Sequence, residues 1–249
     1  MSAATRPVPA KPRFLASGDT ALVIELGDAI DRTVSDAVLR LDARVSAAGL
    51  EGVVETVPTF RSLMVHYDPL ATSGDALEQA LGALLDDGRA EARSGRLWRV
   101  PACYGADLGP DLEDVAKAAK LSTEEVVALH AGVDYHVYMI GFAPGFPYMG
   151  DLPEALDLPR LKTPRTRVPA GSVAIATTLT AVYPFDSPGG WRILGATPVR
   201  LFDSRWERPA LLAPGDAVRF EPVARDAYED LVAAVDRGDW SPESEEIAP

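Results

Sequence analysis

The chain has 249 residues and a net charge of −13; 47% of its residues are hydrophobic and 24% are charged. This composition is ordinary for a globular protein and argues against a disordered chain. The acidic excess argues against a nucleic-acid-binding protein or a basic membrane-binding face, because both need clustered Lys and Arg. The length suits one large domain or two modest ones.

The single cysteine, Cys103, argues against an internal disulfide framework and against a Cys-rich zinc site. It lies in an apolar run, which predicts a buried, inert thiol. Three scattered histidines do not make a zinc site, so we expect no bound metal. Residues 1–13 lack the apolar region of a signal peptide, and no apolar run is long enough to span a membrane. We therefore expect a cytoplasmic protein.

Residues 1–12 are expected to form a flexible leader. The first part of the chain then predicts the order strand-strand-helix-strand-strand-helix. These elements are strands 14–16 and 21–26, a helix from 30 to Gly49, strands 53–57 and 63–67, and a helix ending at Gly88. Thr72 to Asp75 resembles a capping box at the start of the second helix. The polar stretch 86–95 predicts a domain boundary, so residues 1–93 are expected to form a small α/β domain.

The second part, residues 94–240, predicts many short strands separated by Pro and Gly, which is typical of a closed barrel or a sandwich. The expected strands are 97–104, 135–142, 172–176, 180–183, 191–194, 199–202 and 218–222, and the expected helices are 111–119, 122–131 and 226–235. Ser122 and Glu125 have the spacing of a capping box. The acidic tail, residues 241–249, is expected to be frayed.

The stretch from Tyr135 to Asp203 is unusually dense in glycine, proline and aromatic residues. Proline restricts the backbone and glycine opens conformations closed to other residues, so the stretch predicts a backbone held in one particular shape. Two interpretations remain open: long functional loops, or the corners of a β-barrel.

This stretch and its surroundings resemble a known family. The motifs that carry the resemblance are Pro101-Ala-Cys-Tyr-Gly105, Pro110-Asp-Leu-Glu113, Val137-Tyr-Met-Ile-Gly-Phe142, Pro144-Gly-Phe-Pro-Tyr148, Val168-Pro-Ala-Gly-Ser-Val173, Ser187-Pro-Gly-Gly-Trp191, Leu201-Phe-Asp203 and Gly215-Asp216. The chain resembles the B subunit of bacterial 5-oxoprolinase, also known as allophanate hydrolase subunit 1 and as KipI-like kinase inhibitors. The resemblance implies an α+β protein with a small α/β N-terminal domain and a cyclophilin-like β-barrel C-terminal domain.

The family also implies partners and an activity. A C subunit with a related barrel joins the B subunit, and together they resemble the carboxyltransferase part of urea carboxylase. With an A subunit, the pair would hydrolyse 5-oxoproline to glutamate at the expense of ATP, used with Mg²⁺ at a site that a partner can share. The chain has no Gly-rich phosphate loop and no dinucleotide fingerprint. We therefore expect the isolated chain to be inactive.

Candidate anion-binding residues are concentrated near one turn. Lys162, Arg165 and Arg167 form a basic loop in an acidic chain, and Arg suits the bidentate binding of phosphate or carboxylate. Backbone N–H groups that could face an oxyanion belong to Gly171, Ser172, Gly189 and Gly190. The alternative for the basic residues is a solvated loop, and for the glycines it is plain turn geometry.

His130 is the candidate acid–base residue, because the end of its predicted helix favours the protonated imidazole. A lone histidine is more often structural, and we expect His66 and His136 to be structural. A set of aromatic residues could line a pocket or an interface, although each alone suits a core: Phe142, Phe146, Tyr148, Tyr183 and Trp191.

Three departures from the family pattern leave the substrate open. Thr177 and Leu179 stand where the family has Gly and Gln, Ala181 where it favours Gly, and Ala196 where Arg is common. Two other functions therefore remain as alternatives. One is a KipI-like inhibitor that docks on a histidine kinase, and the other is a carboxyltransferase-like subunit of a urea or allophanate pathway.

Overall fold

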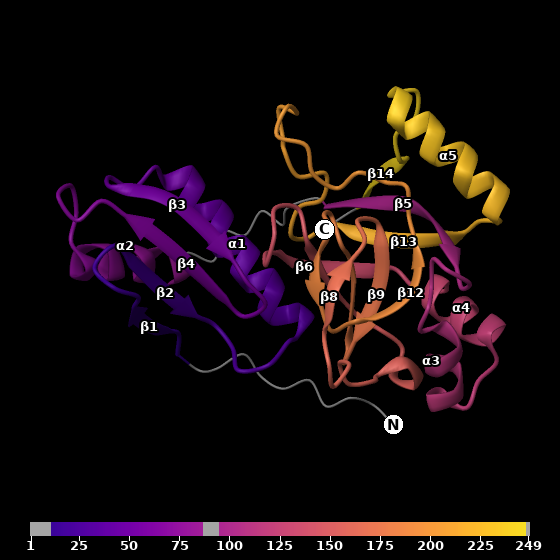
Figure 1. Cartoon of the computed structure of the whole chain (residues 1–249). Helices are drawn as coiled ribbons and strands as arrows, with labels where there is room; N and C mark the ends of the chain where they lie inside the picture. Colours follow the sequence, from indigo (N-terminus) through magenta and orange to yellow (C-terminus); the bar gives the residue numbers. More distant parts are fainter. Residues whose placement is uncertain (1–10, 87–94, 248–249) are drawn as a thin grey trace. The chain divides into compact units, whose positions relative to one another are not determined.

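The computed structural model describes residues 11–86 and 95–247. The chain divides into two compact units, the first ending at Ser94 and the second beginning at Gly95 (Figure 1). Most of the expected leader, the expected helix end at Gly88 and residues 87–94 of the expected boundary lie outside the described residues. Each unit is described by itself below.

The first unit is a four-stranded antiparallel sheet with two helices. The strands are β1 (Arg13–Ala16), β2 (Ala21–Glu25), β3 (Val53–Pro58) and β4 (Ser62–Tyr67), in the spatial order β1-β2-β4-β3, and the helices are α1 (Arg32–Ala48) and α2 (Gly74–Asp86). Alternate residues of the two central strands, such as Ile24 and Leu63, pack against Val38 of α1 and Leu81 of α2. The apolar side chains on one face of the strands and those on one stripe of each helix therefore form a single core.

Helix ends in this unit follow their capping residues. Asp31 accepts hydrogen bonds from the N–H groups of the first turn of α1, and Gly49 ends that helix in the left-handed conformation, φ 55°. The expected capping box at Thr72 is wrong by one residue. The Ser73 hydroxyl accepts the Ala76 N–H at 3.2 Å, so Ser73 caps α2 and the helix begins at Gly74.

The second unit is a closed barrel. Its strands follow one another around the barrel in the order β12 (Arg192–Ala196), β9 (Ser172–Ala176), β10 (Leu179–Val182), β7 (Pro147–Gly150), β6 (Tyr135–Ile140), β13 (Ala217–Pro222) and β5 (Gly95–Tyr104). Pairing of β12 with β5 closes the ring, and β5 and β13 are parallel. The structure confirms the α+β fold class with a barrel in the second part.

Gly195 explains how the ring closes. It lies opposite Tyr104 in the β12–β5 pair, and a Cβ atom at this position would come within 2.4 Å of the carbonyl oxygen of Cys103. Only glycine allows the two backbones to approach this closely. Cys103 is buried, as expected, and burial raises the pKa of its thiol.

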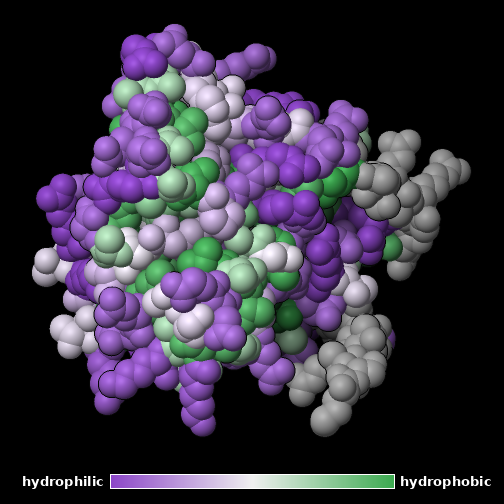
Figure 2. Space-filling view, turned by 90° about the vertical axis from the view of Figure 1, so that its right-hand side faces the viewer, coloured by the Kyte–Doolittle hydropathy of each residue, from purple (hydrophilic) through white to green (hydrophobic). Residues whose placement is uncertain are grey.

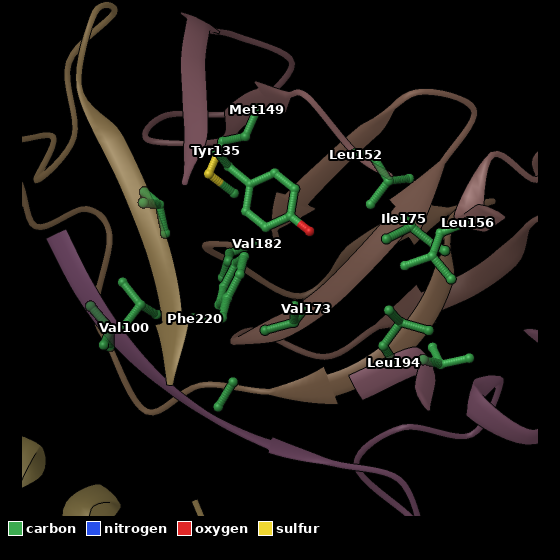
Figure 3. Close-up of a cluster of buried hydrophobic side chains, with 14 of the residues drawn as sticks. Val100, Tyr135, Met149, Leu152, Leu156, Val173, Ile175, Val182, Leu194 and Phe220 are labelled. Atoms are coloured by element: carbon green, nitrogen blue, oxygen red, sulfur yellow. The ribbon is translucent and has the colours of Figure 1, made fainter. Parts of the chain in front are cut away.

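The barrel interior is filled with side chains from all around the ring (Figure 3). Tyr135, Val173, Ile175, Leu194 and Phe220 are almost completely buried there. The Tyr135 hydroxyl donates a hydrogen bond of 2.7 Å to the backbone oxygen of His130, so its one polar atom is satisfied within an apolar surrounding. The interior is a packed core.

The described part of the unit also has three α-helices and one edge strand: α3 (Leu112–Ala119), α4 (Thr123–Ala131), α5 (Arg225–Arg237) and β14 (Ser244–Ile247). The predicted capping box is confirmed: the Glu125 N–H donates to the Ser122 hydroxyl at 3.1 Å, and the Ser122 N–H donates to the Glu125 carboxylate at 2.7 Å. These helices lie on the right-hand side of Figure 1. That side faces the viewer in Figure 2, where hydrophobic residues lie in groups between hydrophilic ones.

Two expectations for this unit are wrong, and three strands were not expected. Residues 244–247 of the tail are not frayed but form β14, because the first half of β5 offers an unpaired edge. Residues 199–202 form no strand; only Phe202 makes a bridge, with Ala210. Strands also form within the Pro- and Gly-rich stretch, namely β7, β8 (Arg165–Val168) and β11 (Ser187–Gly189).

Candidate functional site

The predicted anion-binding residues gather around a small two-stranded ribbon. Its strands β8 and β11 pair antiparallel, with Arg165 opposite Gly189. Backbone bonds tie the flanking loops together: the Leu161 N–H donates to the Gly190 oxygen at 2.7 Å, and the Thr197 N–H donates to the Gly171 oxygen at 2.9 Å. These backbone hydrogen bonds therefore hold the ribbon and its flanking loops in one conformation.

Arg165 is fixed by a buried carboxylate. Its Nη2 lies 2.6 Å from Oδ1 of Asp111, whose side chain is 7% exposed, while the Arg165 side chain is 29% exposed. The other oxygen, Oδ2 of Asp111, accepts the Ile193 N–H at 2.7 Å. Asp111 thus joins the start of α3, the ribbon and β12.

Sequence reasoning missed Asp111. It stands at the N-cap of α3, yet its side chain makes no capping bond to the helix. The available signal was the Pro110-Asp-Leu-Glu113 motif, which by itself indicates a helix start. A helix cap is the common use of Asp at this position, and only the fold shows that this carboxylate faces a guanidinium.

Arg167 is held more loosely. Its Nη2 lies 2.7 Å from the Asp186 carboxylate, and the two side chains are 75% and 46% exposed. Asp186 also accepts the Ala170 N–H at 2.9 Å. That hydrogen bond, followed by the one from Arg167, lowers the pKa of Asp186 below its usual range. Lys162 is exposed, in the loop that precedes the ribbon.

A pocket of 280 Å³ brings several of these residues together. Its lining includes Arg165, Arg167, Ala170, Ser172, Ile193 and Ala196. We call it the ribbon pocket. Two arginines and one acidic residue, Asp107, therefore line one small cavity, beside the turn that leads into β9. Ala196, one of the departures named in the sequence analysis, lies in the same lining.

The prediction that the N–H groups of Gly171 and Ser172 face an oxyanion is wrong. The Gly171 N–H donates to the Tyr183 oxygen at 2.7 Å, and the Ser172 N–H donates to the Pro169 oxygen at 3.2 Å. Both groups are used to shape the turn. Gly171 has φ 81°, and a Cβ there would lie 2.5 Å from the Thr197 oxygen. The glycine is needed for the backbone.

The five predicted aromatic residues form one cluster next to the ribbon. Phe146 is at its centre, with ring centroids 5.1 Å from Tyr183, 5.0 Å from Tyr148 and 6.0 Å from Trp191. Phe142 contacts Phe146 and is 63% exposed. Arg160 lies over the Trp191 ring, 5.7 Å from its centroid. The cluster has a buried centre and an exposed edge at Phe142.

Gly189 connects this cluster to the ribbon. A Cβ at Gly189 would lie 2.3 Å from the Tyr183 hydroxyl oxygen, so this ring can approach the ribbon only because the position is glycine. Gly189 therefore has a packing role in this structure.

The chain is similar to known proteins over most of its length. The model of the carboxyltransferase domain, subdomain C and D, matches residues 12–212. The B subunit of 5-oxoprolinase from Bacillus subtilis is 38% identical over 225 residues, which cover 85% of this chain and 92% of that protein. The chain therefore belongs to the carboxyltransferase-domain family that includes the B subunit of 5-oxoprolinase. The B subunit of 5-oxoprolinase from Escherichia coli O157:H7 is 41% identical over 213 residues, covering 85% of this chain and 96% of that protein.

A solved structure shows the same fold. The urea amidolyase of K. lactis superposes with a TM-score of 0.79 at 20% identity, over 95% of this chain. This chain spans 16% of that protein's length. At this identity the likeness shows the fold alone. In the part of the chain described here, no helix has the length and apolar character needed to cross a membrane.

His130 differs from its prediction. Its side chain is completely buried, with Nδ1 2.8 Å from the Tyr104 hydroxyl and Nε2 2.9 Å from the Thr180 hydroxyl. Burial lowers the pKa of the imidazole to about 3. The expected protonated form is therefore wrong, because desolvation outweighs the helix dipole. His130 bridges α4 to the barrel wall in its neutral form and does not line the ribbon pocket.

Proposed function

We propose that this chain is the B subunit of an ATP-dependent 5-oxoprolinase, which converts 5-oxoproline to glutamate together with C and A subunits. The observation that carries the proposal is the identity of 38% and 41% with two proteins named as the B subunit of 5-oxoprolinase, over 85% of this chain in each case. The matches to urea carboxylase and urea amidolyase are more distant, at 25% and 23% identity.

The chemistry requires activation, because resonance stabilises the lactam amide. Transfer of the terminal phosphoryl group of ATP to the lactam oxygen releases ADP. Attack by water then breaks the ring C–N bond and leaves an acyl phosphate, which a second water hydrolyses to glutamate and phosphate. Both the substrate carboxylate and the transferred phosphoryl group are anions, so the site must supply fixed positive charge.

The ribbon pocket supplies such charge. Arg165 is held in place by Asp111, so its remaining N–H donors are already oriented, and orientation in advance lowers the cost of binding. Arg167 is exposed and its partner Asp186 is on the surface, so an anion can compete for this guanidinium at little cost. The two arginines would act as a fixed and a movable donor.

The pocket's size limits what it binds. Its 280 Å³ is just below the roughly 300–1,000 Å³ found for small-molecule sites. It suits a carboxylate, a phosphoryl group or 5-oxoproline itself, but not a whole nucleotide. Among the described residues, no group of three His, Cys, Asp or Glu could hold a metal ion. We therefore expect Mg²⁺ to arrive with the phosphates and partner residues to complete the site.

The test is reconstitution of activity. The chain is purified with its C and A partners, and glutamate release from 5-oxoproline is followed with and without ATP. Arg165→Gln should raise KM or lower kcat by about tenfold or more, the effect of losing a charged hydrogen bond. Arg219→Gln is the matched control, because Arg219 pairs with Asp134 on the surface and does not line the pocket.

Three results would count against the proposal or a part of it. A complex that contains all three subunits but releases no glutamate would exclude the reaction. Normal kinetics of the Arg165→Gln complex would leave the reaction in place but remove the ribbon pocket from it. Co-purification with a histidine kinase in place of the C subunit would favour the KipI-like alternative.

A further inference from the structure

Ser172 carries a hydroxyl that the fold leaves unused. The residue begins β9, is only 3% exposed and lines the ribbon pocket. Its backbone is occupied, since its N–H donates to the Pro169 oxygen at 3.2 Å and its oxygen accepts the Tyr183 N–H at 3.0 Å. Within the described part of the chain, however, its side-chain hydroxyl has no hydrogen-bond partner. The hydroxyl oxygen is not sealed in the interior, so a group that enters the pocket can reach it.

The neighbour of Ser172 leaves room beside this hydroxyl. Ser172 lies directly opposite Ala196 in the antiparallel pair of β9 and β12, which are adjacent in Figure 1. Side chains of directly opposite residues lie on the same side of a sheet, with Cβ atoms about 4.5–5.5 Å apart. Ala196 also lines the pocket, and its methyl group has no polar atom that could pair with the hydroxyl. The space beside Ser172 is therefore left to a ligand.

A second hydroxyl reaches the pocket from another element. Tyr228 is half-buried on α5 and lines the same cavity. Arg225, one turn earlier, pairs through two nitrogens with Asp107 at 2.6 Å and 3.3 Å, which ties the start of α5 to a loop that also lines the pocket. Across residues 11–86 and 95–247, the Tyr228 hydroxyl has no hydrogen-bond partner. Two elements that are far apart in sequence therefore each bring an unused hydroxyl to one pocket.

The charged groups of the pocket, in contrast, already have partners. Each charged lining residue forms an ion pair: Arg165 with Asp111, Arg167 with Asp186, and Asp107 with Arg225. Counted with their partners, the three guanidiniums and the three carboxylates balance. The pocket therefore suits a ligand with one charge and an uncharged polar part better than it suits a polyanion.

A cyclic amide that bears a carboxylate matches these groups. The carboxylate can only accept hydrogen bonds, and the guanidinium of Arg165 can only donate them, whereas a hydroxyl does both. The ring amide has an N–H donor and a carbonyl acceptor, and no guanidinium can accept that N–H. An amide N–H left unpaired in the pocket would weaken binding, because it has given up its water partner. Since Asp107 already accepts from Arg225, the hydroxyls of Ser172 and Tyr228 are the side-chain groups left to meet the amide.

We infer that Ser172 is a substrate-binding residue whose hydroxyl hydrogen-bonds the ring amide of 5-oxoproline, and that the Tyr228 hydroxyl is a second contact to the same ring. The inference rests on the proposed function for the choice of ligand. It adds the groups that distinguish a lactam from an apolar ring of the same size, because a site built to hydrogen-bond a polar group rejects a ligand that lacks it. Both residues act by binding, and neither forms a covalent bond to the substrate.

The test uses the complex of the chain with its C and A subunits and two ligands. 5-Oxoproline is the substrate, and cyclopentanecarboxylate is a competitive probe that keeps the five-membered ring and the carboxylate but lacks the amide. Ser172→Ala should raise KM for 5-oxoproline about tenfold and leave the inhibition constant of cyclopentanecarboxylate unchanged. Tyr228→Phe removes a hydroxyl from a different element and should raise KM in the same selective way. An unchanged KM in Tyr228→Phe would remove the second contact.

Stability separates this binding role from a structural one. Because the Ser172 hydroxyl has no partner within the described protein, Ser172→Ala should not lower the midpoint of unfolding. Thr180→Val is the matched control. The Thr180 hydroxyl is completely buried and does not line the pocket, and it bonds His130 Nε2 at 2.9 Å and the Ala174 oxygen at 3.2 Å. Its removal should lower the midpoint and leave KM for 5-oxoproline unchanged.

Three outcomes would overturn the inference. The first is a KM for 5-oxoproline that Ser172→Ala leaves unchanged. The second is an equal weakening of cyclopentanecarboxylate in Ser172→Ala, and the third is an equal rise of KM in Thr180→Val, since either would show a general disturbance of the pocket. If the wild-type complex releases no glutamate, the proposed reaction is excluded, and calorimetric binding of 5-oxoproline to the same complex decides the role of Ser172. Weaker binding in Ser172→Ala would then support the contact, and equal binding or no binding to wild type would overturn it.

Discussion

Replacement of Asp111 by alanine tests the physical basis of the ribbon pocket. The carboxylate has two partners, the part-buried Arg165 Nη2 at 2.6 Å and the buried Ile193 N–H at 2.7 Å. Truncation leaves both without an acceptor. An unsatisfied buried donor costs about 1–3 kcal/mol, and breaking a buried ion pair costs about 3–5 kcal/mol. Because water can reach the 29% of Arg165 that is exposed, we expect the lower end, ~3 kcal/mol.

The measurement is unfolding of the full chain by heat, with the transition of the barrel unit followed separately. A loss of ~3 kcal/mol corresponds to a fall in Tm of about 6–12 °C for a unit of this size. Asp186→Ala is the matched control on the same ribbon. Its side chain and that of Arg167 are 46% and 75% exposed, so the ion pair should contribute about 1 kcal/mol or less.

Asp111→Asn separates the two partners of the carboxylate. The amide oxygen can still accept the Ile193 N–H, but the amide nitrogen is a donor and would face the donors of Arg165. We expect its stability to lie between those of wild type and Asp111→Ala. The reasoning is refuted if Asp111→Ala unfolds within about 1 kcal/mol of wild type, the scale of a surface pair, or if it matches Asp186→Ala.

Three further predictions concern the fold. Because buried His130 has a pKa of about 3 against an ordinary 6.5, only the unfolded chain takes up its proton between these values. The free energy of unfolding should therefore fall by about 1.4 kcal/mol per pH unit below pH 6.5, a slope that His130→Gln should lack; an unchanged slope contradicts this. Gly195→Ala should destabilise the barrel by ~1–3 kcal/mol, since its Cβ would meet the Cys103 oxygen, whereas Gly82→Ala, with open space around it, should not; hydrogen exchange at β5 and β12 distinguishes them. Ser122→Ala should cost about 1 kcal/mol through loss of the cap, as measured by chemical denaturation, and no change would show that the cap contributes nothing.

Agreement between sequence and structure is best where the signal is local. The capping box at Ser122 and the left-handed glycine at Gly49 each depend on a few neighbouring residues, and both are found as expected. The strand at 172–176 is reproduced residue for residue, because a short apolar run between turn signals has few other ways to be buried. Such features need no knowledge of the rest of the chain.

Features that depend on distant partners were missed or misread. Strand β14 forms because β5 offers it an edge, although the two are far apart in sequence. Asp111 reads as a helix cap until the fold places it beside Arg165, 54 residues away. The sequence predicts that the Gly171 N–H faces a ligand. In the structure this N–H instead donates a hydrogen bond to the backbone oxygen of Tyr183.

The sequence by itself determined the helices and strands of the first unit, the α-helices of the second unit, the family, and the pair of arginines beside a rigid turn. These follow from local periodicity, from capping residues and from motifs that read along the chain. The tertiary structure decided which of the polar groups are free to meet a ligand. Protonation and hydrogen bonding depend on desolvation and on partners brought together only by folding, which is why His130 is a neutral core residue and Asp111 holds the guanidinium of Arg165.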